Sequence, residues 1–168
     1  MKAIAALLSL LLLAACGFHL RGSSDLPFDT LYIGLPESSD LRAQIARTIE
    51  ASSKTRIVRT PQESQAILTV TSNTLVKNIL SLNSAGRVRE YELVQTFSFH
   101  VDNGKGGTFL PQSDIVIRRD MSYSDDQILS KEAEEVLLRR DMQNDLVQQL
   151  LRRLATIHPT APATTAAH

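Results

Sequence analysis

Apolar and polar side chains alternate along residues 90–101, and this alternation constrains the fold more than any other feature of the sequence. Successive side chains of a β-strand point to opposite faces, so the alternation predicts a strand with one buried face. The other face is expected to meet solvent or a partner. The apolar set is Tyr91, Leu93, Phe97, Phe99 and Val101, and the polar set is Glu90, Glu92, Thr96, Ser98 and His100.

Turn signals lie on both sides of this strand. The segment 103–107 (NGKGG) predicts a hairpin because several of its residues tolerate positive φ, and Ile115 and Ile117 mark the returning strand. A reversal is also expected at residues 84–86, after a long, imperfect strand. Its apolar residues share one parity, which predicts one common face: Leu68, Val70, Val76, Leu80 and Leu82. The three strands predict an antiparallel meander.

The region before the meander has a different pattern. A short strand is expected over residues 30–34 and another over residues 55–59. Between them, Ser39 and Asp40 can cap a helix that runs to about Ser52 and repeats Leu41, Ile45 and Ile49 at every fourth position. This order favours a right-handed parallel crossover.

The chain from Ser124 onward predicts about thirty helical residues by its 3.6-residue period. At 100° per residue, one apolar stripe contains Leu129, Ala133, Val136, Val147, Leu150, Leu151, Leu154 and Ile157. Arg140, Gln143 and Asn144 point the same way and interrupt the stripe. Either the helix bends at this gap, or its middle passes something wetter than a core.

These elements predict an α+β fold, a two-layer α/β sandwich in which two helices pack on one face of a mixed sheet of four or five strands. One domain is expected over residues 28–157. Residues 158–168, a Pro/Ala/Thr tail, have little to bury and are expected to be disordered.

Residues 1–15 have the anatomy of a cleaved signal peptide, with a basic start and a continuous apolar run interrupted by Ser9. The run is shorter than the roughly 20 apolar residues that a membrane-spanning helix needs. A buried core helix would need a polar face at helical spacing, and the row of leucines leaves none.

The signal peptide ends in Leu13-Ala14-Ala15-Cys16, which matches the bacterial lipobox. Cys16 is therefore expected to carry S-diacylglycerol and N-palmitoyl groups, and residues 16–27 to form the lipidated N-terminus and its tether. This lipid would account for the single cysteine, since exported proteins usually pair their thiols or lack them. Gly17, rather than Asp, follows the cysteine and favours delivery to the outer membrane. No other cofactor is expected.

Composition and motifs argue against nucleic-acid binding and against catalysis. The chain has 18 basic and 18 acidic residues, so no net field attracts nucleic acid. The four histidines are far apart in sequence, no metal-ligand spacing is present, and no Ser lies in a Gly-x-Ser-x-Gly elbow. Binding is the better hypothesis, and basic residues near the predicted turns are its candidates, because guanidinium groups match phosphate and carboxylate geometry.

Three segments resemble the LPS-assembly lipoprotein family LptE. They are the hexad Cys16-Gly17-Phe18-His19-Leu20-Arg21, the strand segment Arg89-Glu90-Tyr91-Glu92-Leu93, and the end of the last helix, residues 148–154. The resemblance implies an outer-membrane lipoprotein on the periplasmic side that sits in the lumen of a β-barrel partner, LptD. The pair would form the translocon that places lipopolysaccharide in the outer leaflet. The family member would act as a barrel plug, an aid to barrel assembly and a lipopolysaccharide binder, and not as an enzyme.

The resemblance also implies lipopolysaccharide contacts near the loop before the central strand and near the start of the last helix. Lys131 falls at the second position. At the first, Ser84 or Ala85 stands where a basic residue is expected, and Arg87 and Arg89 lie close enough to substitute.

Two other hypotheses remain open at this point. One is a structural lipoprotein that scaffolds another outer-membrane assembly complex, such as the machinery that folds barrels. The other is a lipid-anchored hydrolase, for which His100 would be the first residue to test.

Overall fold

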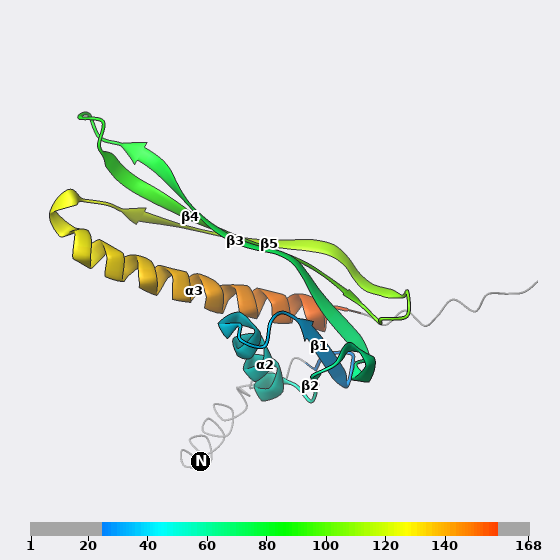
Figure 1. Cartoon of the computed structure of the whole chain (residues 1–168). Coiled ribbons are helices and arrows are strands. Elements are labelled where there is room, and N and C mark those ends of the chain that lie inside the picture. Colours follow the sequence, from blue (N-terminus) through cyan, green and yellow to red (C-terminus); the bar gives the residue numbers. More distant parts are fainter. Residues whose placement is uncertain (1–24, 158–168) are drawn as a thin grey trace, which may run out of the picture.

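The computed structural model describes residues 25–157 (Figure 1). The predicted signal peptide, the predicted lipidation site Cys16 and the predicted tail lie outside these residues. The strands are β1 (Thr30–Gly34), β2 (Arg56–Val58), β3 (Ala66–Leu82), β4 (Val88–Asp102) and β5 (Thr108–Ser122), and the helices are α2 (Asp40–Ser52) and α3 (Ile128–Ala155). Short 3-10 turns at Pro61–Glu63 and Asp125–Gln127 precede β3 and α3. In this part of the chain, neither helix is apolar enough over a sufficient length to cross a bilayer.

The five strands form one mixed sheet in the order β2-β1-β3-β4-β5. Strand β1 is parallel to both β2 and β3, while β3, β4 and β5 form the antiparallel meander. Both helices lie on the same side of the sheet (Figure 1). The predicted α+β class, with a two-layer sandwich and a mixed sheet, is therefore confirmed.

Local sequence signals account for the first helix and the central strand. The Ser39 hydroxyl accepts a hydrogen bond from the backbone N–H of Arg42 at 3.3 Å and caps α2, as predicted. Along β4, the predicted apolar face is buried from Leu93 to Val101 against the helices, while Thr96, Ser98 and His100 occupy the half-exposed opposite face.

The long strand β3 departs from the predicted single face. A bulge between Val70 and Ser72 adds one residue, and this insertion moves the side chains that follow it, as far as the next irregularity after Ile79, to the other face. Val76 therefore lies opposite Val94, on the face away from the helices, and is 49% exposed. The prediction of one shared face is wrong beyond Val70; Leu80 and Leu82 are also exposed.

Helix α3 corrects the predicted stripe in a similar way. Its second half is buried as predicted from Val147 to Ile157. In its first half, Ala133 is exposed, and Leu129 and Val136 are 82% and 66% exposed, so the stripe is wrong there. Two buried residues outside the stripe, Met142 and Leu146, were missed.

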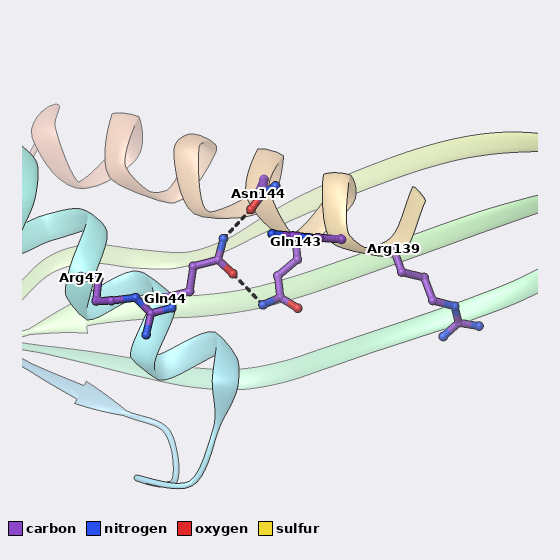
Figure 2. A pocket seen from close by; sticks show the side chains of 6 residues that line it. Gln44, Arg47, Arg139, Gln143 and Asn144 are labelled. Atoms are coloured by element: carbon purple, nitrogen blue, oxygen red, sulfur yellow. Dashed lines mark hydrogen bonds between the residues drawn. The ribbon is translucent and has the colours of Figure 1, made fainter. Parts of the chain in front are cut away.

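The first half of the predicted stripe is exposed because the stripe faces α2, which is shorter than α3. Gln143 and Asn144, which interrupt the stripe, hydrogen-bond to Gln44 of α2 (Figure 2). Helix α2 has 13 residues and α3 has 28, so they span about 20 Å and about 42 Å. Beyond the end of α2, the residues of the stripe are therefore exposed to solvent. The polar residues that interrupt the stripe form amide–amide hydrogen bonds between the two helices.

Substituting one leucine in each half of α3 tests whether the first half is exposed and the second half is buried. Leu146→Ala should lower the free energy of unfolding by about 2–5 kcal/mol, because it leaves a cavity in a fully buried position. Leu129→Ala should change it by no more than about 0.5 kcal/mol, because that side chain is exposed. Chemical denaturation measures the free energy of unfolding of both variants. Equal losses would contradict the burial of Leu146 and the exposure of Leu129.

Candidate functional site

The structure brings the predicted site residues Arg87, Arg89 and Lys131 to one end of the molecule. There the loop between β3 and β4 (residues 83–87) approaches the connection between β5 and α3 (residues 123–127). The Arg87 Nη1 atom lies 3.5 Å from Asp125 Oδ2, and the Tyr123 N–H donates to the Arg89 carbonyl at 2.8 Å. We call residues 83–90 and 122–131 the distal tip. Arg87, Arg89, Tyr123 and Asp125 are among the residues that line a cavity of about 200 Å³ in it.

A single asparagine organises the loop of the distal tip. The Asn83 Oδ1 atom accepts from the backbone N–H groups of Ala85 and Arg87, both at 3.0 Å. Gly86 has a φ of 74°, a conformation that glycine adopts without a Cβ penalty. The loop at Asn103–Gly107 repeats this arrangement, with Asn103 Oδ1 accepting from Lys105 and Gly107. Short polar side chains thus set both predicted reversals of the meander.

The three cations of the distal tip differ in how they are neutralised. Arg87 faces Asp125 across an exposed ion pair. The Lys131 ammonium donates to Ser122 at 2.9 Å and to Glu134 at 2.8 Å, and its side chain is only 14% exposed. Arg89 is exposed and, within residues 25–157, has no carboxylate oxygen within 4.0 Å. Arg89 is therefore the cation that a ligand reaches without breaking an ion pair.

A polar network holds the first half of α3 to the sheet. Glu135 accepts from the Lys77 ammonium at 2.6 Å and from Arg139 Nε at 2.9 Å. Lys77 also lies 4.1 Å from the centre of the Tyr91 ring, within cation–π range, and Tyr91 packs edge-on against Tyr123. The hydrogen bond from Lys77 lowers the pKa of the Glu135 carboxyl, with further contributions from Arg139, and these outweigh partial burial. This network was missed from the sequence because its partners on β3 and α3 are far apart in the chain.

The hydrolase candidate His100 and other polar contacts lie away from the distal tip. His100 is on the outer face of the sheet, with Nε2 at 3.6 Å from Asp102 Oδ2. Arg119 pairs with Asp145 of α3 at 3.1 Å and links the sheet to the helix. Over residues 25–157, no three His, Cys, Asp or Glu residues are grouped to hold a metal ion.

Comparisons with known proteins agree in pointing to one family. A family model described as LptE, Lipopolysaccharide-assembly, matches residues 28–154. The chain is 31% identical over 157 residues to a Pectobacterium atrosepticum protein named LPS-assembly lipoprotein LptE, with 90% of this chain and 83% of that protein covered. A Photorhabdus laumondii protein of the same name is 26% identical over 156 residues, with the same coverage.

Solved structures show the same architecture. The solution structure of a lipoprotein B from Nitrosomonas europaea superposes with a TM-score of 0.73 at 35% identity, covering 83% of this chain and 90% of that one. The crystal structure of the rare lipoprotein B from Shewanella oneidensis superposes with a TM-score of 0.65, covering 76% of this chain and 94% of that one. At 24% identity, the second likeness supports the fold alone.

The Glu135 network predicts a pH-dependent contribution to stability. The pKa of Glu135 is lower in the folded chain than its ordinary value of 4.5. The ionised carboxylate therefore contributes its full stabilisation of the fold at pH values above 4.5. That contribution is lost as the pH falls through the lowered folded pKa. Glu135→Gln should therefore reduce the free energy of unfolding by about 1 kcal/mol at pH 7 and by less at pH 3. Denaturation at both pH values measures the difference, and a loss that is equal at the two would contradict the role of the carboxylate.

Proposed function

The chain belongs to the LptE family of lipopolysaccharide-assembly proteins, and from that premise we propose that it plugs an outer-membrane β-barrel, LptD, and helps to assemble it. In this proposal Cys16 carries the lipid that holds the chain on the periplasmic side of the outer membrane. The barrel and this chain together insert lipopolysaccharide into the outer leaflet, and this chain binds lipopolysaccharide without catalysing a reaction.

The observation that carries the proposal is the exposed apolar surface of the half of the molecule that includes the distal tip. On the first half of α3 the exposed side chains are Ile128, Leu129, Val136 and Leu137, and on β3 they are Leu75, Val76, Ile79, Leu80 and Leu82. Exposed apolar side chains gathered in one region of a protein usually mark a surface that a partner covers.

The directions of these side chains favour a partner that surrounds the chain. Leu75 lies opposite Gln95 and faces the helices, whereas Val76 lies opposite Val94 and faces away from them. Val136 lies on the α2 side of α3, beyond the end of α2. One flat interface cannot cover three such directions, while the wall of a barrel can.

The polar residues of the same half suit a barrel interior. Thr74 and Asn78 flank Val76 along β3, and the Lys77–Glu135–Arg139 network lies between the sheet and α3. The lumen of a large outer-membrane barrel is lined by polar residues. A surface on which polar side chains and neutralised charges lie beside the exposed apolar residues matches such a wall better than a wholly apolar face does.

The distal tip supplies the proposed contact with lipopolysaccharide. Arg89 is the free cation there, and Arg87 and Lys131 add positive charge that Asp125 and Glu134 offset. Ser84 and Ala85, one of which stands about where the resemblance leads us to expect a basic residue, are exposed in the same loop. Lipopolysaccharide phosphates would bind Arg89 first and then compete with Asp125 for Arg87.

Copurification from native envelopes tests the barrel partnership. The lipidated chain, extracted in mild detergent, should carry one dominant β-barrel protein in equal amount. Val136→Lys should reduce that amount several-fold without lowering the melting temperature, because it places a charge on an exposed apolar position. The matched control Gln148→Lys, at an exposed polar position of α3, should not. A different dominant partner would favour the scaffold hypothesis and overturn this one.

Binding of lipopolysaccharide by the full chain tests the distal tip. Arg89→Asp should weaken binding about tenfold or more, because a hydrogen bond to a charged group contributes roughly 1.5–3 kcal/mol. Arg87→Asp and Lys131→Asp should have smaller effects, since both cations are already paired. Arg56→Asp, an exposed position on β2, is the charge control. Unchanged affinity in all three tip variants would exclude the distal tip as the binding site.

A further inference from the structure

A second polar cavity lies between the two helices, near the middle of α3 and apart from the distal tip. It has a volume of about 420 Å³ and is lined by Gln44, Arg47, Arg139, Arg140, Gln143 and Asn144 (Figure 2). We call it the α2–α3 cleft. Its lining contains three arginines and three amides, and no carboxylate. Sequence periodicity showed only that some of these residues interrupt the apolar stripe of α3.

The three amides of the cleft fix one another in orientation. The Gln44 Nε2 group donates to Asn144 Oδ1 at 2.6 Å, and the Gln143 Nε2 group donates to Gln44 Oε1 at 2.7 Å. Gln44 thus uses both ends of its amide to join two residues of α3. The Asn144 Nδ2 group and the Gln143 Oε1 atom remain available, because no side-chain hydrogen bond described for residues 25–157 uses them. One donor and one acceptor are therefore held beside the cavity.

The arginines of the cleft are poorly neutralised. Within residues 25–157, neither Arg47 nor Arg140 has a carboxylate oxygen within 4.0 Å. Arg139 has Glu135, but that carboxylate also accepts from Lys77. Figure 2 shows Arg47 and Arg139 on opposite sides of the amide group. The distal tip differs, since two of its three cations already have carboxylate partners.

We propose that the α2–α3 cleft is a binding site for a sugar phosphate. A phosphomonoester carries up to two negative charges at pH 7 and so matches the two unneutralised guanidinium groups better than a single carboxylate does. Guanidinium forks bind phosphate oxygens, often bidentately. The fixed amides donate to and accept from hydroxyl groups, which a sugar supplies and inorganic phosphate does not. The site is separate from the distal tip and does not depend on the barrel partnership.

The test uses the full lipidated chain in non-ionic detergent, titrated with glucose 1-phosphate, inorganic phosphate and glucose. Side-chain N–H resonances of Gln143, Asn144, Arg47 and Arg140 report the binding site. Glucose 1-phosphate should shift these resonances and bind at least several-fold more tightly than inorganic phosphate, and glucose should not bind. Equal affinity for phosphate and glucose 1-phosphate, or shifts confined to other residues, would overturn the proposal.

Paired variants separate a specific site from general charge. Arg47→Gln combined with Arg140→Gln should weaken binding of glucose 1-phosphate at least tenfold, while Arg152→Gln, an exposed arginine elsewhere on α3, should leave it unchanged. All three positions are exposed, so the melting temperature should not fall. Equal weakening by the control would overturn the proposal. If the double variant is unstable, the single Arg140→Gln variant should still weaken binding.

Competition distinguishes a soluble ligand from a lipid headgroup. Added lipopolysaccharide that displaces glucose 1-phosphate from the cleft would assign the site to the phosphorylated headgroup, and the absence of displacement would assign it to a soluble sugar phosphate. Either result supports the α2–α3 cleft as a binding site for a sugar phosphate. Copurification of the barrel is scored separately, so failure of this inference leaves the proposed function untouched, and the reverse also holds.

Discussion

The short length of α2 limits the hydrophobic core, and the rest of the structure follows from that limit. Where α2 and β1 lie against α3 and the meander, buried side chains such as Ile45, Phe97 and Leu150 hold the layers together. Strands β3 to β5 and the first half of α3 extend past these short elements. There, the Lys77–Glu135–Arg139 network connects the sheet to α3, and the Tyr91 and Tyr123 rings pack against each other. One half is stabilised mainly by burial, whereas in the other half polar contacts contribute and several apolar side chains stay exposed.

The elements that could be predicted from sequence are those whose partners cover their whole length. One face of strand β4 packs against the helices from Leu93 to Val101, so its alternation reports burial there. Helix α2 is buried at every expected position. Helix α3 is different, because periodicity shows which residues share a side but not how far the neighbouring element reaches. Leu129 and Val147 share a side, yet only Val147 has α2 beneath it. The sheet-facing residues Met142 and Leu146 form a second buried direction that a single stripe does not describe.

Strand β3 shows a second limit of sequence reasoning. The extra residue at Thr71 changes the face of the side chains from Ser72 to Ile79, and nothing in the local sequence marks it, since Thr and Ser are ordinary strand residues. Pairing of charges is equally non-local. Lys77 and Glu135 are 58 residues apart, and Arg87 and Asp125 meet only because the β3–β4 loop and the start of α3 fall at one end. The sequence indicates that the candidate cations lie near turns, but it does not show their electrostatic state, which for Arg87 depends on a partner far away in the chain.

That electrostatic state decides where an anion can bind on a chain whose net charge is zero. With a Debye length of about 8 Å at physiological ionic strength, an exposed charge acts mainly on its near neighbours. A cation beside a carboxylate therefore contributes little attraction, whatever its place in the sequence. At the distal tip this reduces three candidate cations to Arg89, whereas between the helices Arg47 and Arg140 both stay unneutralised. The surfaces of this protein that are suited to phosphate are identified by cations that line a cavity and have no carboxylate partner, rather than by the number of basic residues.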